Sequence, residues 1–168
     1  PEVIGLIATG LAESQGADIP RTLLAFREAH PEYAGVTIVP VAAPDTPGCL
    51  ETGFANAVEA IIGALVPAAP THSRPAGAPL PLQVNVLASP MLTTGDVDAI
   101  REWIEAFGLS PLVLPDLGSS LDGQLIEAGY SSLTYGGTGR AEMAAMGDSA
   151  ATLVVGPSLS RAAAALRC

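Results

Sequence analysis

Short runs of apolar residues alternate along the chain with stretches in which apolar residues recur every three or four positions. The runs are typical of strands buried on both faces, and they lie at residues 3–9, 36–41, 84–88, 111–115, 133–135 and 151–155. The periodic stretches are typical of helices with one buried face, and they lie at residues 19–30, 52–66, 94–107, 140–146 and 158–167. Strands that alternate with helices predict an α/β fold in which helices flank parallel sheets.

Capping and helix-breaking residues mark where these helices begin and end. Asp18 is expected to cap the helix at residues 19–30, and Pro31 to end it. Thr94 or Asp96 is expected to cap the helix at residues 94–107, and Gly108 to end it. The buried stripes of the two longest helices are predicted to be Phe54, Val58, Ile61 and Leu65, and Val97, Ile100, Ile104 and Phe107.

A proline-rich stretch divides the pattern into two parts. Residues 67–82 contain five prolines, which neither a helix nor a central strand tolerates, so they are predicted to form a semi-extended linker. The parts on either side, residues 1–66 and 83–168, each hold too few strands for an independent doubly wound sheet. Since the chain starts with Pro1 close to a strand and ends in a helical pattern, we expect it to be a piece of a longer protein.

The charge of the chain narrows the classes of function. There are 17 acidic and 7 basic residues, a net charge of −10, and every basic residue is an arginine. A chain without lysine cannot use a phosphate-binding, Schiff-base or general-base lysine. Scattered arginines on an acidic protein provide no basic stripe, which argues against binding to nucleic acids or to anionic membranes.

The number of cysteines and the hydropathy of the chain indicate the cellular compartment to expect. The two cysteines, Cys49 and Cys168, do not make a disulfide framework. No apolar run reaches the roughly 18 residues of a membrane span, and no basic segment followed by an apolar core opens the chain. We therefore expect a soluble protein of the reducing cytoplasm.

Cys49 is the side chain in the loops that most invites a chemical interpretation. It lies in a Pro/Gly loop between a predicted strand and a predicted helix, where the helix dipole stabilises a thiolate. The alternative is a small apolar residue buried in a turn. Glu13 lies in the polar turn expected at residues 10–16, where carboxylates are usually caps and turn formers. Neither His30 nor His72 has a Cys or His neighbour at a metal-ligand spacing, so both are interpreted as structural or solvated.

The string GGTG at residues 136–139 also falls between a predicted strand and a predicted helix. Such a turn could hold a phosphate, which would suit a small-molecule or nucleotide-binding α/β enzyme domain. The pattern lacks the full GxGxxG fingerprint and its acidic ribose partner, so a tight glycine turn is the favoured interpretation.

Four segments together carry a resemblance to a known family. They are ATGLAESQGADIPRTLL at residues 8–24, APDTPGCLETGFANAVEAI at 43–61, the stretch at 84–123 that begins VNVLASPML, and YGGTGRAEM at 135–143. In order and spacing the chain resembles the nitrogenase molybdenum–iron protein family, and most closely its N-type cofactor-assembly branch. The resemblance implies Rossmann-like parallel sheets flanked by helices, in two partial units. Residues 1–66 would be the C-terminal part of the first unit, and residues 83–168 would form most of the second.

The resemblance implies a scaffold for metallocluster assembly rather than a catalyst. N-type subunits pair with an E-type subunit in an α2β2 heterotetramer, and the nitrogenase iron protein is a further partner. The complex holds an iron–sulfur cluster that is the precursor of the iron–molybdenum cofactor while molybdenum and homocitrate are inserted. The ligands of that precursor belong to the E-type chain, so we expect no metal site in this segment alone.

The resemblance also assigns roles to individual positions. In catalytic β subunits, a cysteine that ligates the P-cluster stands where this chain has Gly10, and a serine that can contact that cluster stands where it has Cys49. Glycine cannot ligate iron, which favours the assembly branch. Gly10, Glu13 and Cys49 are thus expected near a cluster region at the subunit interface. A catalytic nitrogenase-like or protochlorophyllide reductase β-type subunit is the alternative within the superfamily.

Overall fold

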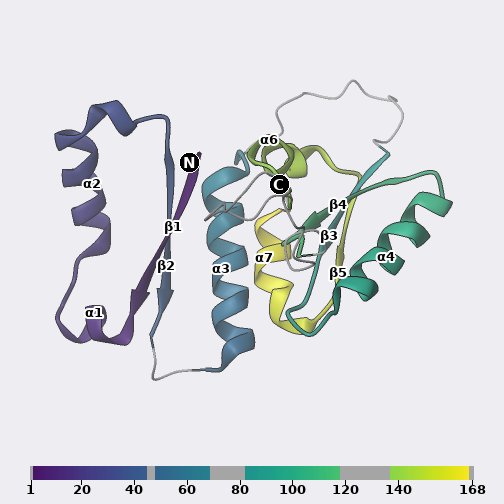
Figure 1. Ribbon diagram of the computed structural model, residues 1–168, viewed down its shortest axis with the longest axis horizontal. Coiled ribbons are helices and arrows are strands. Elements are labelled where there is room, and N and C mark those ends of the chain that lie inside the picture. The colour runs from purple at the N-terminus through teal and green to yellow at the C-terminus, as the bar shows by residue number, and fades with distance from the viewer. Residues whose placement is uncertain (1, 45–47, 69–81, 118–136, 167–168) are drawn as a thin grey trace, which may run out of the picture.

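Two parallel sheets lie on either side of one long helix, α3 (Leu50–Leu65), in the computed structural model of the chain (Figure 1). The structure describes residues 2–44, 48–68, 82–117 and 137–166. The strand expected at residues 133–135 and nearly all of the linker at residues 67–82 lie outside these ranges. The α/β fold with parallel sheets and flanking helices is confirmed.

The first sheet has two parallel strands, β1 (Val3–Thr9) and β2 (Thr37–Ala43), paired from Val3 opposite Thr37 to Thr9 opposite Ala43. Between them the chain forms α1 (Gly10–Ser14), α2 (Ile19–Ala29) and a 3-10 turn, η1 (Pro31–Tyr33). The prediction that Asp18 caps the second of these is confirmed, because its carboxylate accepts a hydrogen bond from the backbone N–H of Arg21 at 3.0 Å.

The turn expected at residues 10–16 is helical over most of its length and forms α1. Neither glycine nor serine favours a helix interior. Gly16, at a φ of 70°, supplies the left-handed residue with which the chain leaves this short helix.

The second sheet has three parallel strands in the order β4-β3-β5, formed by β3 (Gln83–Leu87), β4 (Ser110–Leu114) and β5 (Ala151–Val154). One face is covered by α4 (Thr94–Ala106), which packs on Val86, Ala88 and Val113. The opposite face is covered by α3 and α7 (Ser160–Ala165), with α6 (Arg140–Ala144) and the 3-10 turns η2 (Ala145–Asp148) and η3 (Pro157–Leu159) completing that layer (Figure 1).

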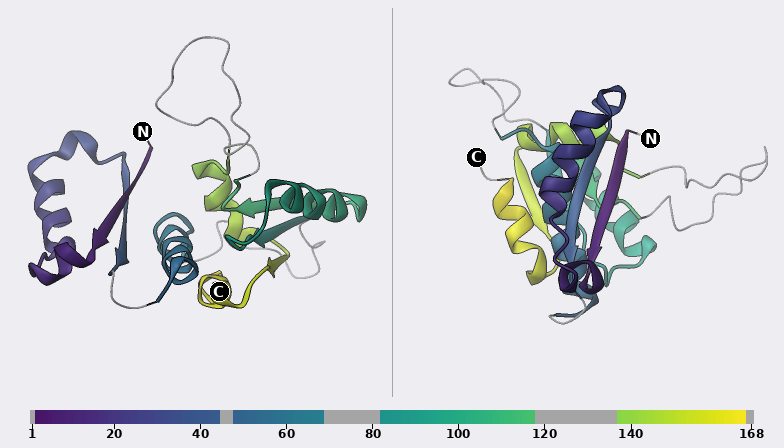
Figure 2. Two further views of the ribbon diagram at one scale, coloured as in Figure 1. Left: turned by 60° about the horizontal axis from the view of Figure 1, so that its bottom comes forward. Right: turned by 90° about the vertical axis from the view of Figure 1, so that its left-hand side faces the viewer.

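Helix α3 belongs to the core of the second sheet as well as lying against the first. Its buried side chains are Val58 and Ile62, one helical turn apart. The centre of the buried stripe therefore lies at Ile62, one position from Ile61, which the sequence predicted. Val58 and Ile62 share one core with Leu87, Leu112, Leu114, Met146, Leu159, Ala162 and Ala163. On its other side α3 lies beside β2, as the left view in Figure 2 shows. A division into folding units at residue 66 stays a prediction.

A thirteen-residue helix, α4, begins with a reciprocal capping box. Thr93 is the cap, one residue before the position expected from the sequence. Its hydroxyl accepts from the backbone N–H of Asp96 at 3.2 Å, and the Asp96 carboxylate accepts from the backbone N–H of Thr93 at 2.8 Å. Gly108 follows the helix at a φ of 74°, which confirms its expected role at the end.

The central strand of the second sheet contains a buried amide, Asn85, which is 1% exposed. Its Nδ2 donates to the carbonyl oxygen of Met146 at 2.9 Å and to Oγ1 of Thr152 at 3.1 Å. Its Oδ1 accepts from the hydroxyl of Ser149 at 2.7 Å. These bonds tie η2 to the sheet, because they satisfy both ends of an amide that would otherwise be buried at high cost.

Within the described residues, none of the helices combines the length and the apolar character needed to cross a lipid bilayer.

Candidate functional site

The residues singled out from the sequence gather at one edge of the first sheet. Gly10 directly follows β1 and is the first residue of α1, which also holds Glu13. Cys49 follows β2 after a loop and immediately precedes α3. Because β1 and β2 are adjacent and parallel, their carboxyl ends lie at the same edge, where parallel α/β sheets usually bind ligands (Figure 1).

A small cavity of about 270 Å³ opens at this edge, and Glu13 is among the residues that line it. Its other walls are mostly apolar and come from the ends of β1, α2 and β2. Neither Gly10 nor Cys49 lines the cavity. The structure therefore brings the three residues to one edge without joining them in a single pocket.

Cys49 is exposed, its thiol is free, and it is the residue that caps α3. Its backbone N–H donates to Oγ1 of Thr52 at 3.3 Å, and its sulfur lies 3.7 Å from the same oxygen. Hydrogen bonds from the backbone N–H of Thr52, from its hydroxyl and from the backbone N–H of Glu51 lower the pKa of the Cys49 thiol. The nearby charge of Glu51 and partial desolvation oppose them. The thiol therefore has more thiolate character than a free cysteine.

Two further residues shape this thiol and were not singled out from the sequence. Thr52 supplies two of the three hydrogen bonds that lower the pKa of the Cys49 thiol. Gly48 has a φ of 90°, and a Cβ at that position would lie 2.8 Å from the side chain of Thr52. Glycine is thus required before Cys49 by both its backbone conformation and the available space. The sequence does show a glycine directly before the predicted start of the helix, and that position could have indicated the tight turn at Gly48.

The described residues do not by themselves fit an iron–sulfur cluster. Residues 2–44, 48–68, 82–117 and 137–166 contain no group of three or more His, Cys, Asp and Glu side chains that could hold a metal ion. Clusters are usually held by several thiolates, and Cys49 is the one cysteine within those ranges. A cluster at this edge would need ligands from another polypeptide segment.

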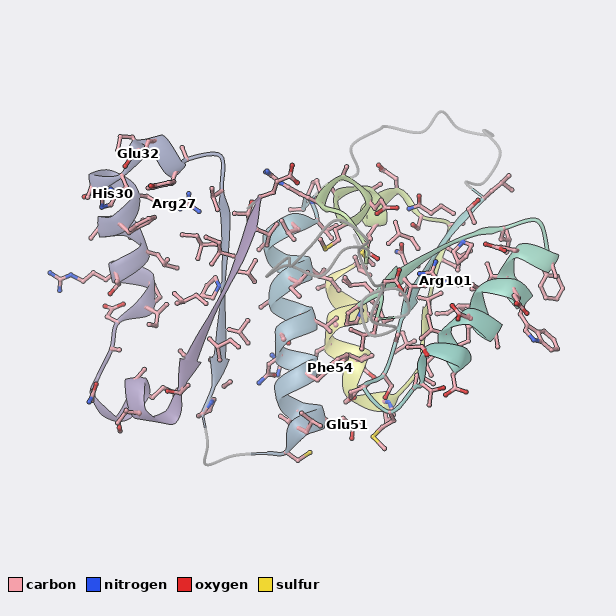
Figure 3. The ribbon with its side chains drawn as sticks, in the orientation of Figure 1. Arg27, His30, Glu32, Glu51, Phe54 and Arg101 are labelled. Atoms are coloured by element: carbon pink, nitrogen blue, oxygen red, sulfur yellow. The ribbon has the colours of Figure 1, made fainter. Side chains whose placement is uncertain are left out.

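His30 lies beside a carboxylate and two aromatic rings, which fits its interpretation as a structural or solvated side chain. Its Nδ1 lies 3.1 Å from Oε1 of Glu32 (Figure 3). The centre of its ring is 5.0 Å from that of Phe26 and 6.1 Å from that of Tyr33. His72 lies outside the described residues.

The glycine turn before α6 is not arranged to hold a phosphate. The backbone N–H of Gly139, which would face such a ligand, donates at 2.7 Å to Oε2 of Glu142. Thr138 is also engaged, because its hydroxyl donates to the carbonyl oxygen of Val113. A carboxylate at the start of the helix repels an anion there. Gly136, the first residue of the expected motif, lies outside the described ranges.

The fold and this edge define a class of α/β protein, one with paired Rossmann-like parallel sheets and a candidate site at strand carboxyl ends. Over residues 1–167 the chain matches the family described as "Nitrogenase component 1 type Oxidoreductase", and it belongs to that family.

Similar proteins in this family are named for cofactor assembly. The chain is 43% identical over its full length to "Nitrogenase iron-molybdenum cofactor biosynthesis protein NifN" of Klebsiella pneumoniae, of which it covers 36%. It is 43% identical over 97% of its length to the protein of the same name from a Nostoc species, of which it covers 35%. It thus spans about a third of the length of these relatives.

A solved structure has the same fold. The structure named "Nitrogenase Cp1 at pH 6.5" superimposes with a TM-score of 0.82 at 26% identity, over 99% of this chain and 34% of that one. The nitrogenase-like fold expected from the sequence is confirmed.

Proposed function

We propose that the chain is a segment of a scaffold subunit on which the iron–molybdenum cofactor of nitrogenase is assembled. The observation that carries this proposal is 43% identity along the whole chain to a NifN cofactor biosynthesis protein. Gly10 supports it, because a residue without a side chain cannot supply the iron ligand that the resemblance assigns to catalytic β subunits. The subunit would act as a non-catalytic scaffold in the cytoplasm, and the precursor of the cofactor is its cargo.

The partners in this proposal are an E-type scaffold subunit, in an α2β2 heterotetramer, and the nitrogenase iron protein. The potential metal ligands of this segment support a cluster site shared with a partner subunit. Cys49 provides one exposed thiol, and the described residues near it do not complete a cluster. In the assembly, the edge that carries Gly10, Glu13 and Cys49 would face the partner near a cluster. The thiol of Cys49 would be available there because hydrogen bonds lower its pKa.

Anaerobic co-expression of the full-length parent with an E-type partner tests the function. We expect the two chains to co-purify and the complex to show iron–sulfur absorbance. A parent chain that never pairs and carries no iron would defeat the proposal. Cys49→Ala and the matched Cys168→Ala test the role of Cys49, since only the first is expected to change the iron content or the cluster spectrum.

Nucleotide binding at the glycine turn is the competing function, and one contact argues against it. Glu142 already accepts the hydrogen bond from the backbone N–H of Gly139 that a phosphate would need. We therefore expect no heat of binding and no thermal shift when millimolar nucleotides are titrated into the protein. Saturable binding that Glu142→Gln strengthens would favour the nucleotide-binding alternative.

A further inference from the structure

The first sheet packs against the rest of the described structure through an apolar contact between β2 and α3. Ile38 of β2 lines a small cavity together with Phe26 of α2. Its neighbour Val39, which is 1% exposed, therefore points to the opposite face of the sheet, which α3 covers. Apolar packing holds two surfaces together but has no direction, so it does not by itself fix the angle between the first sheet and the second.

A hydrogen bond at one end of β2 supplies a direction. Nη1 of Arg140, the first residue of α6, donates to the carbonyl oxygen of Gly35 at 3.3 Å, and the two residues are 105 positions apart in the sequence. Within the described ranges, this is the one hydrogen bond that joins residues 2–44 to residues 82–166. Because hydrogen bonds weaken steeply when they bend, this contact favours one orientation of the first sheet.

The carbonyl that Arg140 meets needs a partner from outside the sheet. Strand β2 pairs with β1 from Thr37 onward, so the carbonyls of Gly35 and Val36 precede the ladder. Arg27 of α2 donates to the carbonyl oxygen of Val36, also at 3.3 Å. One of the two carbonyls is thus served from within the first unit and the other from the second. The long side chain and several donors of arginine suit such a reach.

The helix that carries Arg140 is itself fixed to the second sheet. Met143 of α6 packs against the core that α3 shares with that sheet. Just before the helix, the hydroxyl of Thr138 donates to the carbonyl oxygen of Val113 in β4. A positive charge in the first turn of a helix gains nothing from the helix dipole, so α6 alone does not account for an arginine at this position. The contact with Gly35 does account for it.

Arg140 and the candidate site lie at opposite ends of β2. Arg140 contacts the chain just before β2 begins, toward the top of Figure 1. Gly10, Glu13 and Cys49 lie at the other edge of the sheet, where β1 and β2 end. The seven residues of β2 separate the two ends by about 20 Å. A rotation of the first sheet about α3 that breaks the contact at one end therefore displaces the site at the other.

We propose that Arg140 is a positioning residue for the candidate site. It holds the first sheet at one angle to the second sheet, and so determines where the edge with Gly10, Glu13 and Cys49 lies relative to β3, β4 and β5. The contact of Arg140 with Gly35 does not depend on the cofactor role. Only the use of that edge beside a cluster rests on the proposed function.

Electron–electron double resonance between two spin labels tests this inference in the full-length parent. The labels are attached to a genetically encoded ketone amino acid in place of Gln15, exposed directly after α1, and of Glu102, exposed on α4. Loss of one hydrogen bond shifts a conformational equilibrium by about two- to tenfold. In Arg140→Ala we therefore expect the share of distances outside the main peak to grow by that factor. Arg140→Lys keeps a long cationic donor and should restore most of the parent distribution.

Arg161→Ala is the matched control. It removes an ion pair of Arg161 with Glu59, at 2.9 Å, that lies between α7 and α3 and does not involve the first sheet. Its distance distribution should equal that of the parent. An unchanged distribution in Arg140→Ala, or equal broadening in Arg140→Ala and Arg161→Ala, would overturn the inference.

A second variant keeps the test decisive if Arg140→Ala does not fold. Arg140→Gln keeps a polar residue at the start of α6, but its side chain is too short to replace the guanidinium, so the same broadening is expected and its absence counts against the inference. The measurement needs neither an iron cluster nor a partner subunit. Its result is therefore independent of whether the parent assembles the cofactor.

Discussion

At the scale of single residues, the thiol of Cys49 depends on a neighbour one helical turn away. The backbone N–H and then the hydroxyl of Thr52 lower the pKa of this thiol. Replacing Thr52 with valine removes the hydroxyl and keeps the backbone N–H. In Thr52→Val we therefore expect part of the lowering to be lost, so that alkylation of Cys49 begins at a higher pH.

The rate of iodoacetamide labelling against pH measures this shift, in a Cys168→Ser background so that one thiol reports. Thr94→Val, a matched change on a different helix, should leave the profile of Cys49 where it is. Identical profiles for the parent and Thr52→Val would show that the hydroxyl has no influence on the thiol.

Asn85 supports a second prediction at this scale. Asn85→Leu leaves the buried carbonyl oxygen of Met146 and the hydroxyls of Ser149 and Thr152 without their amide partner. We expect a loss of about 2–3 kcal/mol in the free energy of unfolding, measured by urea denaturation. Thr152→Val removes one of these bonds and should lose about 1 kcal/mol. Equal losses from the two variants would contradict a network centred on Asn85.

Local capping could be predicted from the sequence because it depends on residues close together in the chain. Asp18 caps α2 as expected, and Gly108 ends α4. The hydrogen bonds of Asn85 could not be predicted, because their partners are more than 60 residues away in sequence. The edge that holds Gly10, Glu13 and Cys49 was suggested by the resemblance, whereas the dependence of Cys49 on Thr52 required the actual geometry of the cap.

At the scale of elements, α3 provides a direct comparison between neighbouring isoleucines. Ile62 is 1% exposed in the shared core, whereas Ile61 is partly buried at its margin. Ile62→Ala should reduce the free energy of unfolding by about 2–5 kcal/mol, and Ile61→Ala by clearly less. Urea denaturation of the two variants measures the difference. A larger loss for Ile61→Ala would place the centre of the buried stripe where the sequence predicted it.

The capping box of α4 should give stability that depends on pH. Hydrogen bonds from the backbone N–H of Thr93 and then from its hydroxyl lower the pKa of Asp96 below its ordinary 3.8. A lowered folded-state pKa stabilises the protein above that ordinary value, and the stabilisation is lost as pH falls through the lowered value. The Tm difference between the parent and Thr93→Ala should therefore be full at neutral pH and should shrink below pH 3.8.

The background variant Asp96→Asn controls for this pH dependence. With no carboxylate at this position, the Tm difference caused by Thr93→Ala should no longer vary over the same pH range. If the Tm difference still varied with pH in this background, groups other than Asp96 would cause the pH dependence.

The number and type of most elements followed from the sequence, since apolar runs and helical periodicity are local signals. The centre of the α3 stripe did not. With sheets on two of its sides, α3 has only a narrow polar stripe, Thr52, Asn56 and Glu59. The apolar pattern Phe54, Val58, Ile61 and Leu65 is as regular as the stripe that contains Ile62. Which of the two is buried most deeply depends on the second sheet.

At the scale of the whole molecule, α3 bears on where the folding units divide. A chain that begins at residue 83 would expose the core side chains that α3 covers, Leu87 and Leu159 among them. We expect such a chain to unfold without a cooperative transition and to bind the dye ANS, whereas a chain that begins at residue 48 should unfold cooperatively. Circular dichroism during heating measures this. Cooperative unfolding of the shorter chain would support a boundary at residues 67–82.

The shared core of α3 also has a consequence for synthesis on the ribosome. Ile62 packs in one cluster with Ala162, which is 162 − 62 = 100 residues later in the chain. Bacterial and eukaryotic ribosomes add about 5–20 residues per second, so one side of α3 emerges roughly 5–20 s before its partners exist. During that interval an apolar helix is available to chaperones or to neighbouring nascent chains. The yield of native protein should therefore depend on translation speed and on chaperone supply.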